Sequence, residues 1–220
     1  AWRRQAGHAR WAWWILLGSI TAGLMIRGAL LTAAPAHGYK WDHDDFGRWG
    51  VQAADRGVTD LYKAPPPSWP LRTVEPDGRM VDRRRAMARP FNYPPIAAYV
   101  LWATGEVHKA ISADRVLNTV QARTVYALAS IVASVIAALG CRAVVMAAGG
   151  TALAGSAAAA VVMLFPGLMI DDTLWSQTDS WVIAAGVWMV WAMMRGRWLT
   201  AGALWGVALG LKTQGVLLGP

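Results

Sequence analysis

The sequence has almost no cysteine and few charged residues. Cys141 is the only cysteine among 220 residues, so an internal disulfide is excluded. Charged residues make up only 15% of the chain, whereas hydrophobic residues make up 55% and the mean hydropathy is +0.31. A soluble domain of this length usually carries more charge. The composition therefore indicates a membrane protein.

Acidic residues are also scarce, with 13 Asp and Glu against 21 Lys and Arg, and the net charge is +8. Such a balance can indicate nucleic-acid binding. Here, however, the basic residues lie at the ends of apolar segments and in one loop, so no soluble basic domain presents them. We expect the lipid bilayer and lipid phosphates as partners, and no nucleic acid. The 14 tryptophans fit the membrane–water interface.

The first apolar segment covers residues 11–34 and carries one charge, Arg27. Its length and composition predict a transmembrane helix. No A-x-A cleavage site leads from it into a soluble domain, so we expect it to be retained. The sequence begins at Ala1 without methionine and stops at Pro220 directly after an apolar run, and we expect it to be the N-terminal fragment of a longer protein.

Positive charge near the ends of the spans predicts the topology. The arginines of residues 1–10 place this terminus in the cytoplasm, so the chain emerges outside after Ala34. Placing the short loops at Arg142 and at Arg195 in the cytoplasm makes residues 120–220 transmembrane helices 2 to 5, with the fifth ending outside. These four spans are expected at Val120–Cys141, Val144–Phe165, Asp179–Met194 and Trp198–Leu218.

Residues 35–119 then form one extracytoplasmic loop. Asp45–Gly57 shows helical spacing of apolar residues, and Pro94–Ile111 is apolar but charged, so both are expected as interfacial helices. If Pro94–Ile111 crossed the membrane instead, every later segment would be reversed. Residues 63–90 are rich in proline and then in arginine, and we expect an irregular, solvated connection. The predicted fold is an all-α, polytopic membrane protein with about five transmembrane and two interfacial helices.

Several motifs follow one another in the order found in a known superfamily. The run GYKWDHDDFGRW from Gly38 to Trp49, followed by N-Y-P-P from Asn92, resembles the first extracytoplasmic loop of the GT-C membrane glycosyltransferases. Further on, LFPGLMIDDTLWSQTDSW and LKTQGVLLGP resemble the W-G-Q-x-D segment and a K-P-Q-x-x-x-x-x-P span end of that family. The likeness extends from Gly38 to Pro220. It is closest to bacterial relatives of the glucosyltransferases that use dolichyl-phosphate glucose in asparagine-linked glycosylation.

The resemblance implies an inverting hexosyltransferase, a glucosyltransferase or a mannosyltransferase. Its donor would be a polyprenyl-phosphate sugar, and its acceptor a glycan, lipid or protein of the cell envelope. It would act on the extracytoplasmic face of a bacterial plasma membrane as a multi-pass protein. Three positions depart from the family pattern: Ser176 replaces a glycine, Asn92 an aspartate and Thr213 a proline. None of them removes the residue expected to do the chemistry.

The acidic run suits this reaction. Transfer from a lipid phosphate releases a charged phosphate, so the enzyme needs a carboxylate to accept the acceptor's hydroxyl proton and cations to hold the phosphate. Asp42 lies at the position of the family's essential aspartate, before Trp49, and is the expected catalytic base. Asp44 and Asp45 are expected to orient the acceptor or to raise the pKa of the base. Alternatively, the aspartates cap a helix that begins at Asp45.

Other substrate-binding candidates lie further along the chain. Gln177 and Asp179 occupy the second outer loop, although Asp179 can also cap the next helix. Lys212 is expected in the outer third of the bilayer, where its ammonium, beside Gln214, suits the donor phosphate; the alternative is a lysine that extends to the interface without a ligand. Tyr93 is a further candidate, although its main expected role is to begin the interfacial helix at N-Y-P-P.

The acidic residues leave a divalent metal open as a cofactor. Asp42 with Asp44, or Asp171 with Asp172, supplies the hard oxygen ligands that such ions prefer. A different class also remains open: a non-catalytic transporter or channel subunit whose aspartates lie at the mouth of an ion pathway. The charges cluster at the outer ends of the spans rather than at mid-bilayer, which favours an enzyme acting at the interface.

Overall fold

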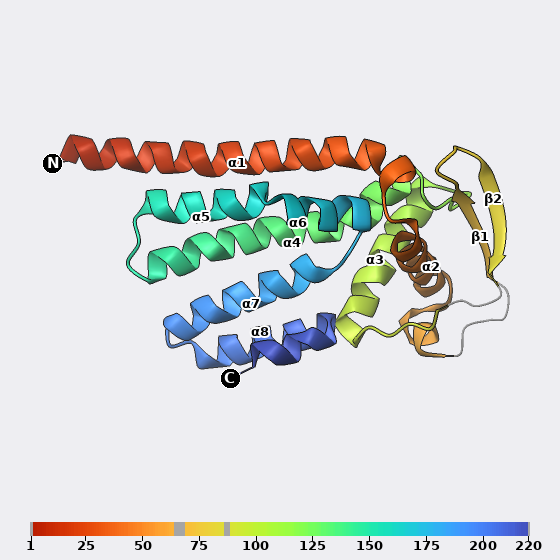
Figure 1. The fold of residues 1–220 in the computed structure, drawn as a ribbon. Helices are drawn as coiled ribbons and strands as arrows, with labels where there is room; N and C mark the ends of the chain where they lie inside the picture. The colour runs from red at the N-terminus through yellow and green to blue at the C-terminus, as the bar shows by residue number, and fades with distance from the viewer. Residues whose placement is uncertain (1, 64–68, 86–88, 220) are drawn as a thin grey trace.

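The computed structural model describes residues 2–63, 69–85 and 89–219, and they form a long helical bundle with a smaller layer across one end (Figure 1). The longest helix, α1 (Trp2–His37), contains the predicted span 11–34 and runs along the whole bundle. The remaining long elements are α4 (Val120–Ala147), α5 (Ala152–Leu164), α7 (Asp179–Met194) and α8 (Trp198–Leu211). The all-α membrane fold is confirmed.

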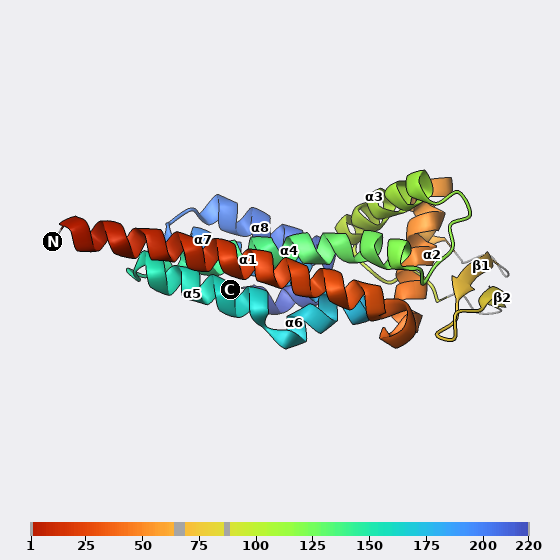
Figure 2. The same ribbon diagram turned by 90° about the horizontal axis from the view of Figure 1, so that it is seen from above.

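The helices differ in how far they could reach across a bilayer. Among the described residues, the helical segments Arg10–His37 and Val120–Ala147 are long and apolar enough to cross, each with 28 residues. A third span is formed if α5 is counted with α6 (Pro166–Ile170) and η2 (Asp171–Trp175), which bend away from it by 46°. Helices α7 and α8 are apolar but shorter. They pack side by side, and α7 also packs against α4, as Figures 1 and 2 show.

The boundary predicted at Arg142 is wrong. Helix α4 continues through Arg142 to Ala147, and the turn to α5 falls at residues 148–151. This turn contains residues typical of a helix end and of a helix start. Gly149 has a φ of 88°, and the side chain of Thr151 accepts a hydrogen bond from the backbone N–H of Ala154 at 3.1 Å. Arg142 lies within the helix, and its guanidinium is 5.4 Å from the centre of the Trp13 ring, as in a cation–π contact.

The predicted end of the last span at Leu218 is also wrong. Helix α8 ends at Leu211, and the chain turns back as the short 3₁₀ segment η3 (Thr213–Leu218). Gly215 permits this close return, because a Cβ there would lie 2.6 Å from the carbonyl carbon of Ala208. The indole N–H of Trp205 donates to the Gly215 carbonyl at 3.1 Å and holds the turn. Lys212 therefore follows the helix instead of lying within it.

The layer across the end of the bundle contains α2 (Lys40–Arg56), η1 (Val58–Tyr62) and α3 (Pro95–Ile111), so both expected helices of this loop are present. Helix α2 begins five residues before the predicted start, Asp45. Helices α2 and α3 pack against each other, inclined to the long helices (Figure 1). Their backbones approach closely at Gly50 and Gly105, where a Cβ on either residue would clash.

The connection between these helices is not irregular throughout. Strands β1 (Trp69–Val74) and β2 (Met80–Arg85) form an antiparallel hairpin, with a turn at Gly78, whose φ is 85°. Leu117 holds β1 through two backbone hydrogen bonds, of 2.8 Å to the Arg72 carbonyl and 3.1 Å from the Val74 N–H. Three adjacent arginines, Arg83 to Arg85, obscured the strand pattern of β2 in the sequence. Residues 64–68 and 86–88 of this connection lie outside the described residues.

Candidate active site

The first turn of α2 carries Asp42 at the edge of a cavity of about 260 Å³. The cavity lies between α2, the segment that precedes α3 and the loop that follows η2. Aromatic packing holds these parts together: the ring centres of Trp49 and Phe91 are 5.4 Å apart, and those of Phe46 and Tyr93 are 5.6 Å apart. The lining residues are Asp42, Asp45, Phe46, Trp49, Arg89, Pro90, Asn92, Tyr93 and Gln177.

Asp42 and Gln177, which are 135 positions apart in the chain, meet at this cavity. The side-chain amide of Gln177 donates a hydrogen bond to the Asp42 carboxylate. The guanidinium of Arg89 lies 3.9 Å from the other carboxylate oxygen. Partial burial raises the pKa of Asp42 above its usual value, while Arg89, Gln177 and Lys212 act in the opposite direction. A carboxylate with a raised pKa is a better proton acceptor near neutral pH.

Lys212 acts electrostatically on this carboxylate and has a partner of its own. Its ammonium forms an ion pair with Asp179, which begins α7, so the start of α7 and the end of α8 are joined. The Lys212 side chain is 14% exposed and that of Asp179 is 52% exposed. The ammonium still acts electrostatically on both Asp42 and Tyr93. The structure therefore brings Asp42, Gln177, Asp179 and Lys212 to the same end of the bundle.

Tyr93 links the cavity to the Lys212–Asp179 pair. Burial raises the pKa of the Tyr93 hydroxyl, although the positive charge of Lys212 opposes the shift. The carbonyl of Tyr93 accepts a hydrogen bond of 3.1 Å from the Tyr62 hydroxyl.

Gln214, by contrast, is exposed on η3 and contacts the hydroxyl of the adjacent Thr213; it does not line the cavity.

The two neighbouring aspartates have different partners. Asp44 is buried, forms an ion pair with Lys40 and accepts a hydrogen bond of 3.2 Å from the Thr73 hydroxyl, which fastens the hairpin to α2. Asp45 lies 3.0 Å from Arg48 and 3.6 Å from Arg89. The alternative in which they cap a helix beginning at Asp45 is wrong, because α2 begins at Lys40 and both side chains are buried within it.

Of the two aspartates of η2, Asp172 forms a buried network. Asp172 is fully buried; its carboxylate lies 3.0 Å from Nε of Arg27 and accepts a hydrogen bond of 2.6 Å from the Ser134 hydroxyl. Within the described residues, no group of three His, Cys, Asp or Glu side chains lies close enough to hold a metal ion. Since Asp44 and Asp172 are neutralised by Lys40 and Arg27, the geometry gives no support to a metal at either predicted pair.

Sequence reasoning missed two arginines. Arg89 belongs to a run that reads as a solvated loop, yet its guanidinium lies beside Asp42 and Asp45. Its position three residues before Asn92, which begins the N-Y-P-P motif, could have indicated that Arg89 belongs to the site. Arg123 lies in an apolar run and is fully buried, and two of its partners, Tyr39 and Leu174, are distant in sequence. No local pattern indicated its contacts.

Comparisons with known proteins agree with the resemblance seen in the motifs. The model of the ALG6, ALG8 glycosyltransferase family matches residues 87–220. This region contains Arg89, Tyr93, Gln177 and Lys212, whereas Asp42 precedes it. A search of curated proteins and a search of solved structures each found no match.

Proposed function

The chain belongs to the ALG6, ALG8 glycosyltransferase family, whose members act on lipid-linked sugars, and we propose that Asp42 is the catalytic base of an inverting hexosyl transfer. The donor is a polyprenyl-phosphate hexose, and the acceptor is an extracytoplasmic glycan, lipid or protein. One observation carries the proposal: the Asp42 carboxylate faces a cavity of about 260 Å³ and is held there by Gln177.

The reaction that fits is a single displacement. Asp42 accepts the proton of the acceptor hydroxyl as its oxygen attacks the anomeric carbon of the donor. The bond from that carbon to the phosphate oxygen breaks, and the polyprenyl phosphate leaves with the electron pair. Attack opposite the leaving group inverts the anomeric carbon. The raised pKa of Asp42 suits it to this step, because a base works best when its pKa approaches the working pH.

Two cations are available to the departing phosphate. Arg89 lies at the cavity with a side chain that is 59% exposed, so it can turn toward a ligand. Lys212 acts electrostatically on Asp42, and its pairing with Asp179 keeps the ammonium at the end of α8. Guanidinium and ammonium groups stabilise phosphate through charge-assisted hydrogen bonds. We assign the donor phosphate to the space between Arg89 and Lys212.

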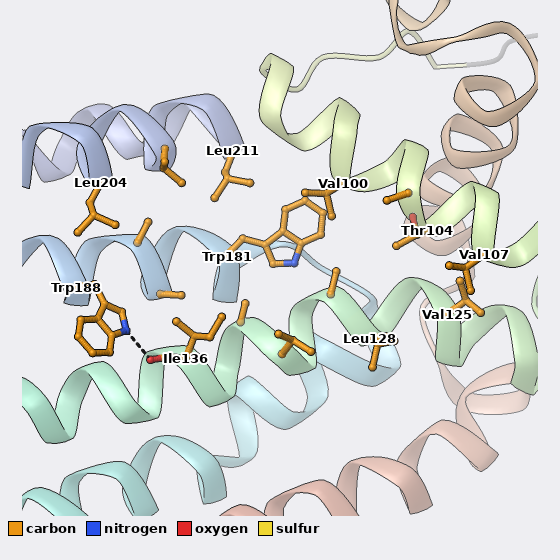
Figure 3. Close-up of a pocket in the computed structure, with 17 residues that line it drawn as sticks. Val100, Thr104, Val107, Val125, Leu128, Ile136, Trp181, Trp188, Leu204 and Leu211 are labelled. Atoms are coloured by element: carbon orange, nitrogen blue, oxygen red, sulfur yellow. Dashed lines mark hydrogen bonds between the residues drawn. The ribbon is translucent and has the colours of Figure 1, made fainter. Parts of the chain in front are cut away.

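A second, apolar cavity supports a lipid donor. It has a volume of about 540 Å³ and lies between α3, α4, α7 and α8 (Figure 3). Its lining includes Leu211, which precedes Lys212, and Trp181, which follows Asp179 by two residues. An isoprenoid chain attached to a phosphate at Lys212 can therefore enter apolar surroundings directly. A nucleotide-linked donor would have no use for this surface.

The placement of charge supports an extracytoplasmic site. The arginine-containing N-terminal end of α1 and the α7–α8 turn, which carries Arg195 and Arg197, lie at the end of the bundle opposite α2 and α3 (Figure 1). Basic residues at span ends are enriched on the cytoplasmic side. Asp42 is accordingly assigned to the outer face of a bacterial plasma membrane. Asp45 holds Arg89 in place, and Tyr93 and Asp179 border the donor.

The family match favours this enzyme over a transporter or channel subunit with an acidic ion pathway. Proteoliposomes containing the protein would be supplied with polyprenyl-phosphate glucose or polyprenyl-phosphate mannose, and in parallel with nucleotide sugars. We expect transfer from a polyprenyl-phosphate sugar alone, with inverted anomeric configuration in the product by NMR, and none from the nucleotide sugars. Ion flux without transfer from any lipid donor would contradict the proposal, and retention of configuration would exclude the single displacement.

A further inference from the structure

We propose that Arg123 is a positioning residue for this reaction. Its buried guanidinium fixes the segment that carries Asp42 against the segment that carries Gln177. The inference rests on the proposed function of Asp42. It adds a residue that contacts neither the cavity nor the reacting groups.

Arg123 lies in the first turn of α4 and is fully buried. Its Nε donates to the side-chain oxygen of Asn118 at 2.9 Å. Its Nη1 donates to the backbone carbonyls of Tyr39 at 3.3 Å and of Leu174 at 3.2 Å. A guanidinium presents its donors in fixed directions within one plane, so these bonds define the relative positions of their acceptors.

The two carbonyl acceptors are close in sequence to the proposed active pair. Tyr39 precedes Asp42 by three residues, and Leu174 precedes Gln177 by three residues. The segments also meet directly, because the N–H of Tyr39 donates to the Leu174 carbonyl at 2.7 Å. We call the contact between these two segments, at Tyr39 and Leu174, the junction. Arg123 donates hydrogen bonds to both of its sides, and the hydrogen bond between Asp42 and Gln177 lies three residues further along each segment.

The backbone segments at the junction are closely packed. A Cβ on Gly38 would lie 2.7 Å from the Leu174 carbonyl oxygen and 3.0 Å from Nη1 of Arg123. Only glycine at this position lets the chain pass between α1 and α2 so close to η2. A change of a few tenths of an ångström here would be carried to the Asp42–Gln177 contact.

The remaining partner of Arg123 is itself held in place. The side-chain amide of Asn118 donates to the carbonyl of Pro35 at 3.1 Å and to that of Val74 at 2.6 Å. The backbone N–H of Asn118 donates to Nε2 of His43, next to Asp42. Arg123 and Asn118 together thus join the end of α1, the start of α2, the hairpin and η2. Burial of a cation is unfavourable unless it is compensated. Here the compensation comes from the carbonyl acceptors that flank the reacting pair and from the negative charge of Asp44, while Nη2 has no hydrogen-bond partner among the described residues.

The first test is kinetic. Arg123→Lys keeps the charge but loses the fork that reaches two carbonyls and Asn118. We expect kcat to fall about 10- to 100-fold while KM for the polyprenyl-phosphate donor changes less than about threefold, because alignment rather than binding is lost. Gln177→Ala should have a similar effect, and the double variant should be no slower than the slower single variant. Losses that multiply in the double variant would overturn the proposal.

Arg142→Lys is the matched control, since Arg142 lies in the same helix at the opposite end and contacts Trp13. Its kcat should equal that of the wild type. The thermal unfolding midpoints of all variants, measured in detergent, show whether the loss in Arg123→Lys accompanies general destabilisation. A fall in kcat seen equally in Arg142→Lys would also overturn the proposal.

The second test measures the geometry of the junction through a cross-linking rate and needs no activity assay. In a Cys141→Ser background, Tyr39→Cys and Trp175→Cys place thiols where the two native rings lie 6.4 Å apart. A short bifunctional thiosulfonate should cross-link them quickly, and adding Arg123→Lys should slow the reaction several-fold. An unchanged rate would overturn the positioning role. If even the wild type transfers no sugar, the proposed function fails while this test still reports on the junction.

Should Arg123→Lys not fold, Gly38→Ala probes the same junction from the other side. Its added Cβ displaces Nη1 or the Leu174 carbonyl. We expect the same fall in kcat and the same absence of additivity with Gln177→Ala. A folded Gly38→Ala protein with normal kcat would contradict the proposal.

Discussion

Arg27 of α1 and Asp172 of η2 form an ion pair whose Nε–Oδ2 distance is 3.0 Å, with both side chains fully buried. Nη1 of Arg27 also donates to the Met163 carbonyl at 2.8 Å. Both residues belong to apolar parts of the chain, where an unpaired charge is unfavourable. The pair therefore joins the first helix to the segment that carries Leu174 and Gln177.

Breaking this pair should destabilise the protein more than removing it altogether. Arg27→Met leaves the Asp172 carboxylate buried without a cation, and we expect a loss of about 3–5 kcal/mol in the free energy of unfolding. The double variant Arg27→Met with Asp172→Leu should recover most of that loss. Unfolding in detergent, followed by circular dichroism, measures both. Equal stability of the single variant and the wild type, or additive losses in the double variant, would show that the pair is not coupled.

Ser176 adopts a left-handed backbone conformation with a φ of 55°, at the position where the GT-C pattern has glycine. A Cβ is unfavourable there, so Ser176→Gly should be more stable than Ser176→Ala by about 1 kcal/mol. Ser156, which is buried in the helix α5, provides the control, because glycine in a helix is less stable than alanine by about 1 kcal/mol. The stability order of the Gly and Ala variants should therefore reverse between the two sites. The same order at both sites would rule out backbone strain at Ser176.

The acidic side, or limb, of the pH–rate profile should reflect the ionisation of the Asp42 carboxylate. The base must be deprotonated, so kcat/KM falls as the pH drops through its pKa in the free enzyme. Burial raises this pKa while Arg89 lowers it, so Arg89→Gln should raise it further and move the limb to higher pH. Arg79→Gln, which removes an exposed arginine paired with Asp77 in the hairpin turn, should leave the limb in place. A limb that moves to lower pH in Arg89→Gln would contradict Asp42 as the base.

Filling the apolar cavity should discriminate between donors by chain length. Ala103 lines the cavity from α3 and is exposed, so Ala103→Phe adds volume there without overpacking a buried position. We expect KM to rise about 10-fold for a long polyprenyl donor and little for a two-isoprene donor, as lost apolar contact is worth about 1.4 kcal/mol per factor of ten. Ala157→Phe on the exposed face of α5 is the control and should change neither value. Equal effects on both donors would exclude the cavity from chain binding.

Local patterns predicted much of the fold. The apolar segments gave the helices, and Asp179 and Pro95 begin α7 and α3 almost where expected. The predicted helix boundaries were wrong where a residue contacts a part of the chain that is distant in the sequence or folds back on it. Arg142 suggested a loop but contacts Trp13 within α4. Helix α8 ends earlier than predicted, and Gly215 allows the chain to fold back after it, which periodicity does not reveal.

The site was predicted unevenly for the same reason. Motif order indicated Asp42, Gln177, Asp179 and Lys212, and the structure gathers them. Partners could not be predicted: Arg27 and Asp172 are 145 positions apart, and nothing in the sequence pairs Lys212 with Asp179. Asp44 resembled a functional carboxylate, yet its partners Lys40 and Thr73 belong to the fold.

The most direct test of the central claim is the rate of Asp42→Asn under saturating donor, together with its donor affinity. Asparagine keeps the shape and the contact with Gln177 but cannot accept the proton. We expect kcat to fall about 10²- to 10⁴-fold while Kd for the polyprenyl-phosphate sugar stays within about threefold of wild type. Asp114→Asn, in the exposed turn after α3, should behave like the wild type. Normal turnover by folded Asp42→Asn would contradict the assignment of Asp42 as the base.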